Sequence, residues 1–358
     1  MLIAFPQLEP LWPMRCFCIF ALCLFLLNGL NPSLAAGKAV LPETPNGKTL
    51  IPSADKDGIK RCELTIEPIE QEILNANGKI VKIRAFGFNG TTPGPTLVFT
   101  EGDHVAITVI NHLPESTTVH WHGVILPNRM DGAPCAGESS PMIKTGETFT
   151  YEFIVQQSGT HMYHTHTNVA KQNMLGLAGG LIFLPKTRNP QDVDRDIIYF
   201  LHEWKLPQHA KAGAKEPGPT SMSETSTDKV ISESTAPDWK ARDFNFFTMN
   251  GKAFPSTDPI NVKKSERIRV RFYNVGIDTH PIHLHGQDFW HTEQDGNLLA
   301  NPMKINTITV APGQTQAIEI DAINPGVWPF HCHIADHATN NTSSGMGGMA
   351  TVLRVDEN

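Results

Sequence analysis

The sequence of 358 residues contains no long segment with a sustained helical pattern of apolar residues, so a helical fold is not expected. A hydrophobic run long enough to cross a membrane is also lacking. The apolar run CFCIFALCLFLL after Arg15 has about a dozen residues, whereas a spanning helix needs about 20, so we expect no stable membrane anchor. Positive charge is not in excess either. Lys and Arg number 29 against 36 Asp and Glu, a formal net charge of −7, and nothing favours nucleic acid or an anionic membrane as a partner.

The first residues have the features of a targeting segment. Arg15 precedes the apolar run, and the small residues of NPSLAAG provide a cleavage site near Ala35 or Ala36. We predict that residues 1–36 are a signal peptide and that the protein is exported, either periplasmic or secreted. Cysteine is scarce, with six in the whole chain, and cleavage would leave only Cys62, Cys135 and Cys332.

Strands and turns are expected in the rest of the chain. Short runs rich in β-branched residues recur between turn signals, as in TLVFTEGDHVAITVINHLP and RIRVRFYNVG, and they predict an all-β fold of β-sandwiches. The length suffices for two domains. A stretch rich in Pro, Gly, Ser and Thr at 205–240 predicts a linker or a long surface loop between a first domain at 60–204 and a second at 241–358.

The most informative segment is His331-Cys332-His333. Successive side chains of a strand point to opposite faces, so the two histidines would emerge together while Cys332 points away from them. One cysteine, two histidines and a weak sulfur ligand form the ligand set of a blue copper centre. The chain can supply such a set from His280, Cys332, His337 and Met346.

Eight histidines, His331 and His333 among them, form four pairs at i, i+2 spacing, which places both members of each pair on one face of a strand. The pairs are His120 and His122, His164 and His166, His283 and His285, and His331 and His333. Eight imidazoles are far more than one or two single metal ions use, and they suit a cluster of three copper ions. His280 lies three residues before His283 and therefore falls on the Cys332 side.

In content and order these motifs resemble those of the multicopper oxidases, the family of the laccases, from about residue 64 to the end of the chain. The resemblance implies two cupredoxin-like Greek-key β-sandwich domains and four copper ions, of which one is type 1, one type 2 and two type 3. It implies that His120 and His283 hold the type 2 copper, and that His280, Cys332 and His337 hold the type 1 copper. The type 3 ligands would be His122, His164, His166, His285, His331 and His333.

The axial sulfur ligand is expected from SSGMGGMATVLRV, which contains both Met346 and Met349. Blue copper domains commonly end with the ligand methionine, one residue, a glycine and then a strand, and Met346 fits that order. Met349 would then be the first residue of the strand and a core residue. The separation of His337 from Met346 is longer than in most laccases.

Asp131 follows His122 by nine residues, where members of the family carry an acidic residue near the three-copper cluster. Because the reduction of dioxygen consumes protons, we predict that its carboxylate relays them. The alternative is a turn residue, since Asp-Gly is itself a turn signal. His161 is a candidate for a residue that supports the copper ligands without binding copper itself. Core or surface positions without copper are expected for His104, His112, His202, His209 and His291.

Each predicted domain carries four of the eight cluster histidines. Two-domain members of the family resemble one another in forming head-to-tail homotrimers with clusters between subunits, and a closed ring keeps such an interface from growing into a filament. We therefore predict a homotrimer with an intersubunit copper cluster. With Cys332 on copper, Cys62 and Cys135 are left either to form a disulfide or to stay free thiols.

The function that the resemblance implies is the transfer of single electrons from a small reducing substrate, at an exposed His337 edge, to dioxygen. Phenols, aromatic amines, metal ions and a protein donor all fit as reductants. Two alternatives remain. A copper nitrite reductase has one type 2 copper between subunits and its blue site in the first domain, which four histidine pairs argue against. A copper-binding or copper-tolerance protein would be favoured by a dense methionine run, which the 11 Met do not form.

Overall fold

The computed structural model describes residues 40–45, 47–74, 80–135, 137, 139–187, 193–206, 236–340 and 345–357. The predicted signal peptide and most of the predicted linker lie outside these residues. Within them, no helix is long and apolar enough to cross a membrane.

Among the described residues, strands make up nearly all of the regular structure, and the helices are single short turns. The helical elements are η1 (Asn128–Met130), α1 (Val169–Gln172) and α3 (Ala335–Thr339). The strands of the N-terminal part are β1 (Pro42–Glu43), β2 (Thr49–Leu50), β3 (Ile59–Leu74), β4 (Ile80–Phe88), β5 (Gly94–Thr100), β6 (His104–Asn111), β7 (His120–His122), β8 (Thr148–Ile154), β9 (Gly159–His164) and β10 (Ala178–Leu184). Those that follow are β11 (Arg195–Trp204), β12 (Phe246–Met249), β13 (Ile260–Lys263), β14 (Arg267–Asn274), β15 (His280–Leu284), β16 (Phe289–Gln294), β17 (Asn297–Ile305), β18 (Thr307–Val310), β19 (Thr315–Asp321), β20 (Gly326–Cys332) and β21 (Ala350–Asp356). The predicted all-β fold is confirmed.

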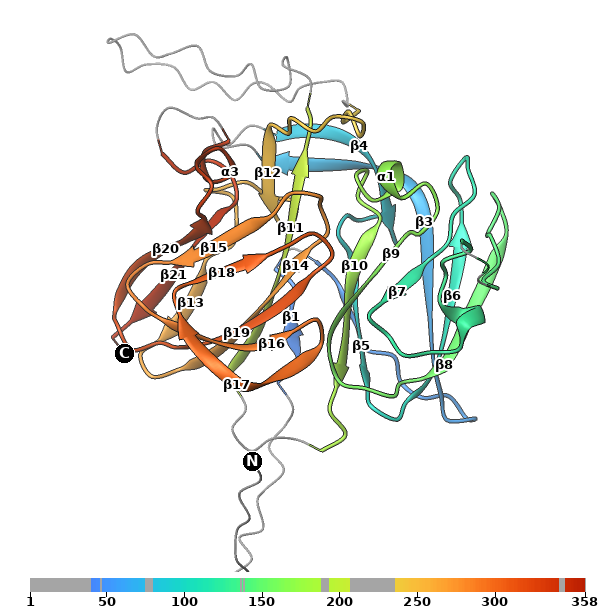
Figure 1. Ribbon diagram of the computed structural model, residues 1–358, viewed down its shortest axis with the longest axis horizontal. Coiled ribbons are helices and arrows are strands. Elements are labelled where there is room, and N and C mark those ends of the chain that lie inside the picture. The colour runs from blue at the N-terminus through green and yellow to red at the C-terminus, as the bar shows by residue number, and fades with distance from the viewer. Residues whose placement is uncertain are drawn as a thin grey trace, which may run out of the picture. The chain divides into compact units, whose positions relative to one another are not determined.

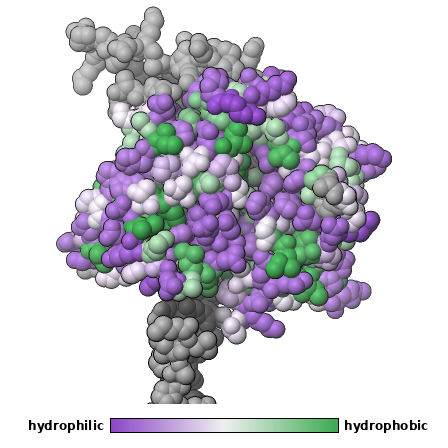
Figure 2. Space-filling view, viewed as in Figure 1, coloured by the Kyte–Doolittle hydropathy of each residue, from purple (hydrophilic) through white to green (hydrophobic). Residues whose placement is uncertain are grey.

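The strands form four sheets that pair into two sandwiches (Figure 1). The first sheet has the order β4-β3-β6-β8 and the second β2-β5-β10-β9-β7. One apolar core, with Leu64, Val109, Trp121 and Leu181, lies between them. The third sheet, β1-β11-β14-β19-β16-β17 with β12 beside β11, and the fourth, β13-β21-β20-β15-β18, enclose a second core. On the face drawn in Figure 2, hydrophobic residues lie in separate patches among hydrophilic ones, as expected when the main apolar surface is enclosed between sheets.

Strand β11 is apolar along almost its whole length because it is covered on both faces. Tyr199 belongs to the core between the third and fourth sheets, whereas Phe200 packs against residues of the second sheet. The parallel pairing of β11 with β14 places residues 195–204 in the third sheet, whereas these residues were expected from the sequence to belong to the first domain. We propose that the boundary between the sandwiches lies before β11. A short apolar run in the sequence shows that a strand is buried but not which strand it pairs with. Here the partner, β14, lies about 70 residues further along the chain.

Buried polar contacts join the two sandwiches. Arg271 of β14 forms an ion pair with Asp196 of β11 at 2.8 Å and donates a hydrogen bond to the Thr160 hydroxyl of β9. The amide of Thr160 donates to Glu293 of β16 at 2.8 Å, and its carbonyl accepts from Thr315 at 2.8 Å. A buried charge is stable only when its partners satisfy it, so this network fixes β9 against the third sheet. Strand β9 carries part of the histidine site described next.

Candidate metal centre

The buried copper set, His280, Cys332 and His337, is assembled from β15, β20 and α3. In the antiparallel pairing of β15 with β20, Ile282 lies opposite Cys332, which brings His280 beside the thiol. The ligand atoms of all three residues lie within 4.8 Å of one another. Cys332 Sγ is 3.9 Å from His280 Nδ1 and 3.6 Å from His337 Nδ1, and the two nitrogens are 3.1 Å apart. Two imidazoles and a thiol that converge in this way fit one copper ion.

The surroundings of this set favour metal binding over protonation. Phe247 stacks on His337 at 3.9 Å between ring centroids, and burial lowers the pKa of His337 to about 4. Burial also raises the pKa of the Cys332 thiol to about 12. The imidazole is therefore neutral and ready to bind at pH 7, whereas the thiol keeps its proton until a metal ion displaces it. An exposed His337 edge was expected from the sequence, but the residue is only 8% exposed because Phe247 stacks on its ring.

The two methionines differ in burial. Met349 is fully buried in the core that contains Cys332, and its carbonyl accepts a hydrogen bond from the Cys332 amide at 3.0 Å. Met346 is half-buried in the segment before β21. The amide of Gly347 donates to Ala338 O at 2.9 Å, so this segment lies beside the helix that carries His337. The axial role of Met346 stays a prediction.

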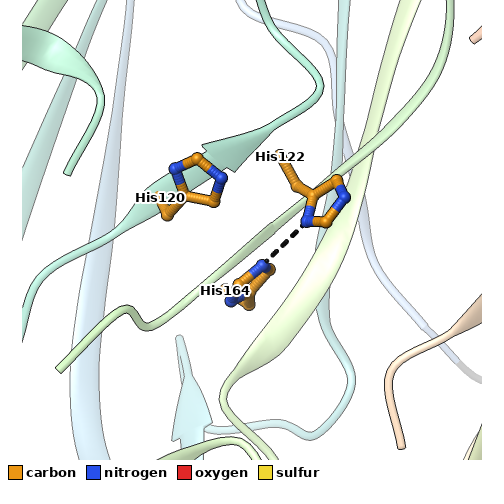
Figure 3. A group of neighbouring side chains, drawn as sticks. All are labelled: His120, His122 and His164. Atoms are coloured by element: carbon orange, nitrogen blue, oxygen red, sulfur yellow. Dashed lines mark hydrogen bonds between the residues drawn. The ribbon is translucent and has the colours of Figure 1, made fainter. Parts of the chain in front are cut away.

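The N-terminal histidine set comprises His120, His122, His164 and His166. Strand β7 pairs with β9 so that His120 lies opposite His164. The ligand atoms of His120, His122 and His164 lie within 4.8 Å of one another, and Figure 3 shows the three rings gathered around one place. His122 Nδ1 is 3.1 Å from His164 Nε2. The His166 ring lies 5.2 Å from that of His120, so all four imidazoles form one group.

Hydrogen bonds fix which nitrogen of each ring faces the group. His164 donates from Nδ1 to the carbonyl of Thr165 at 2.7 Å, which leaves Nε2 free toward His122. Burial lowers the pKa of His164 to about 3, so the ring stays neutral. His120 donates from Nδ1 to the carbonyl of Asp131 at 2.9 Å, and a carboxylate oxygen of Asp131 lies 3.4 Å from the same nitrogen. Asp131 thus contacts the predicted type 2 ligand directly and also ends helix η1, so its two interpretations are compatible in space.

The turn after Asp131 depends on a glycine. Gly132 has φ of +79°, and a Cβ there would lie 1.7 Å from the carbonyl oxygen of Val119, next to His120. Gly137 has a similar φ of +86° but open space around it.

We expect Gly132→Ala to lower the free energy of unfolding clearly more than Gly137→Ala does. Both substitutions carry the backbone cost of a left-handed conformation, about 1–2 kcal/mol, but only the first also forces the backbone of Val119 to move. Denaturant unfolding of the metal-free variants measures the difference. Equal losses in the two variants would mean that the turn yields easily and does not hold His120 in place.

The C-terminal histidine set comprises His283, His285, His331 and His333. His285 Nε2 and His331 Nε2 are 3.1 Å apart, and the rings of His283 and His333 are 5.5 Å apart. His283 donates from Nδ1 to Asn306 O at 2.8 Å, and His331 donates from Nδ1 to Cys332 O at 2.8 Å. His283, His285 and His333 lie on the outer surface of the fourth sheet, whereas Cys332 points into the core.

The two histidine sets do not meet in one chain. Every ring contact of the described cluster histidines joins members of the same set. His122 instead lies near Gly313, where an added Cβ would be 3.5 Å from the ring. The structure therefore brings together four histidines twice and leaves the two groups apart.

The other histidines and cysteines have different surroundings. His161 is buried against Phe183, His104 contacts Glu152 at 2.8 Å, and His291 donates to Gln316 at 2.7 Å. His202 is buried beside Trp204, His112 is exposed, and His209 lies outside the described residues. Cys62 and Cys135 are free thiols, and Cys135 Sγ lies 3.9 Å from His166 Nδ1.

Glu203 is a site residue that the sequence analysis missed. It is fully buried near the end of β11, and its Oε2 lies 3.3 Å from His280 Nε2. Burial alone would raise the pKa of this carboxyl, but hydrogen bonds from His280 and Ile277 and the charge of His202 outweigh it and lower the pKa. The only feature of the sequence that could have pointed to Glu203 is the presence of a charged residue within the apolar run IIYFLHEW.

A pair of β-sandwiches with a buried His-His-Cys set next to paired surface histidines defines a copper protein of the cupredoxin type. More specifically, the chain belongs to the multicopper oxidase family, whose models match residues 70–188 and 221–356. The predicted family and the cupredoxin-like fold class are therefore confirmed.

Individual relatives agree with this assignment. The blue copper oxidase from Nitrosomonas europaea has 31% sequence identity to this chain. Its crystal structure matches with a TM-score of 0.69 over 83% of this chain and 86% of that one. The multicopper oxidase mco of Staphylococcus epidermidis is 29% identical over 82% of this chain, and the copper resistance protein A of Escherichia coli is 29% identical over 65%. The matched regions cover 59% and 42% of the lengths of these two relatives.

Proposed function

We propose that the protein is an exported, laccase-like multicopper oxidase, periplasmic or secreted, that couples the one-electron oxidation of a small reducing substrate to the reduction of dioxygen to water. The observation that carries the proposal is the segment His331-Cys332-His333. Its thiol belongs to the buried copper set, and its imidazoles belong to the C-terminal histidine set. Cys332 of the electron-transfer site is thus joined by one peptide bond to each of two histidines of the cluster.

The residues fit four copper ions, one of type 1, one of type 2 and two of type 3. The buried set supplies two nitrogens and a sulfur, with Met346 as the axial ligand, which is the donor set of a blue site. The eight paired imidazoles supply the type 2 and type 3 ligands. When bound, copper would supply the one-electron redox chemistry and the reduction of dioxygen. The protein positions the donors, lowers the pKa of His164 and His337 by burial so that these rings stay neutral, and excludes water from Cys332, which is fully buried.

Electrons would enter at His337, because this buried residue still has an exposed fraction of 8%, whereas His280 has none. Asp278 lies beside it, with a carboxylate oxygen 3.9 Å from His337 Nε2. A small donor that reaches this edge fits the proposal. Phenols, aromatic amines and reduced metal ions remain the candidate substrate classes.

The proposal includes a homotrimer in which the N-terminal histidine set of one subunit faces the C-terminal set of the next. Each set has four imidazoles, and those of His283, His285 and His333 in the C-terminal set are accessible on the outer surface of the fourth sheet. Such an interface joins two different surfaces, and a ring is the arrangement that closes it.

We further propose that Asp131 relays protons to dioxygen at the cluster. Asp131→Asn keeps the size of the side chain and removes its charge, so the reoxidation of the reduced enzyme by dioxygen is expected to slow at least tenfold. Reduction of the blue copper by substrate should keep its normal rate. Stopped-flow absorbance at the blue band separates the two half-reactions. Unchanged reoxidation would leave Asp131 as a turn residue only.

A copper-tolerance role is the second candidate, because one relative is named copper resistance protein A. A copper-binding protein with incidental oxidase activity would bind copper but turn over slowly with every donor. The nitrite reductase alternative has less support, since that enzyme would leave most of the four histidine pairs without a metal.

Oxygen uptake by the copper-loaded protein tests the proposed function. Phenols, aromatic amines, ferrous ions and cuprous ions would be supplied in turn, and four electrons should be consumed for each dioxygen with at least one donor class. The protein loaded with zinc instead of copper is the control. Release of hydrogen peroxide, or nitrite reduction without oxygen uptake, would contradict the proposal.

A further inference from the structure

A carboxylate lies behind one histidine of the buried copper set. Glu203 Oε2 is 3.3 Å from His280 Nε2, while Nδ1 of the same ring faces Cys332 and His337. The imidazole ring stands between the carboxylate and the place where a metal would bind. Glu203 is therefore a contact of a ligand and not itself a ligand.

The turn after β14 is built around this carboxylate. The amides of Ile277 and Asp278 both donate to Glu203 Oε1, the second at 3.0 Å. A Cβ at Gly276 would lie 1.9 Å from Glu203 Oε2, so only a glycine leaves room for it. Asn274, which is fully buried, braces the turn by accepting from the Gly276 amide at 3.0 Å and donating to Asp278 O at 2.7 Å.

This arrangement has two consequences for His280. An imidazole that donates its Nε2 proton to a carboxylate keeps the lone pair on Nδ1, which is the atom that faces Cys332. A negative charge held close to the site without solvent also stabilises the more positive, oxidised form of a bound copper ion. Burial of a carboxylate is costly unless it is fully paired, and all three donors here are aimed at Glu203.

We propose that Glu203 is a positioning residue that fixes the orientation and tautomer of His280 and lowers the reduction potential of the copper held by His280, Cys332 and His337. The inference rests on the proposed function, since it requires that this set bind the blue copper.

Glu203→Gln tests the proposal, because it keeps the shape of the side chain and removes its charge. At a fixed solution potential, the ratio of reduced to oxidised blue copper is expected to rise about tenfold, which is about 59 mV for one electron. The affinity of the buried set for copper should fall about tenfold, as when other partners of metal-bound histidines are replaced. Redox titration of the blue band and competition with a copper chelator measure the two effects.

Glu293→Gln is the matched control, because Glu293 is also a buried carboxylate of the third sheet but contacts Thr160 and Arg271 instead of a copper ligand. Its blue copper should keep the potential and affinity of the wild type. Equal values in the two variants would overturn the role of Glu203.

If Glu203→Gln does not fold, Glu203→Asp draws the carboxylate back by one methylene and should still weaken copper binding several-fold. An affinity equal to that of the wild type would then overturn the proposal. A wild-type protein with full copper content but no blue band would overturn the proposed function together with it, whereas a blue wild type with an unaffected Glu203→Gln would overturn only the inference about Glu203.

Discussion

Two inactive variants of this chain are expected to restore oxygen consumption when they are mixed. One carries His120→Ala and His122→Ala, and the other carries His331→Ala and His333→Ala. Each variant loses half of one of its two histidine sets, but an intact N-terminal set from one chain can face an intact C-terminal set from the other. With random exchange at equal amounts, about a quarter of the interfaces in a ring are complete, so activity should reach about a quarter of that of the wild type.

The control is a mixture of two chains that are both altered in the N-terminal set, one at His120 and His122 and the other at His164 and His166. No interface in such a ring is complete, so this mixture should stay inactive. Subunit exchange is verified by mass spectrometry of differently tagged chains. A fully active wild-type monomer, or verified mixed oligomers without oxygen consumption, would show that the cluster forms within one chain.

The second large effect is expected at Cys332. Cys332→Ser removes the thiolate from the buried copper set, so the visible absorption of the copper-loaded protein should disappear and substrate oxidation should fall to background. The copper bound by the eight paired histidines should remain. Visible spectroscopy and metal analysis measure the two outcomes.

Cys62→Ser is the matched control for this prediction. Cys62 is a free thiol whose pKa is also raised to about 12 by burial, but it lies on β3 of the N-terminal sandwich. This variant should stay blue. Full blue colour in Cys332→Ser, or its loss in Cys62→Ser, would refute the ligand assignment.

The histidine sets illustrate what spacing alone predicts. Because side chains alternate along a strand, the sequence was enough to place His331 and His333 on one face and Cys332 on the other, and the structure has Cys332 in the core. The same local rule applied to His120 and His122, which share one face of β7. Strand alternation is a property of the backbone, so it does not depend on the rest of the fold.

Features that depend on distant neighbours were not accessible in this way. Strand β11 was assigned to the first domain, yet its partner is β14, because apolar character says that a strand is buried and not against what. The expected exposure of His337 was wrong for the same reason, since Phe247, about 90 residues earlier in the chain, covers the ring. Glu203 lies 77 residues before His280, and only packing shows that the two meet.

The sequence by itself therefore determined the all-β class, the two groups of candidate metal-binding side chains and the family, because these follow from residue types and short spacings. The tertiary structure decided the pairing of β11 with β14, the burial of His337, the contact of Asp131 with His120 and the carboxylate behind His280. It also decided that the two histidine sets stand apart within one chain. The physical reason is that side-chain direction is a local property of a strand, whereas burial, pairing and charge contacts arise only when segments far apart in sequence pack together.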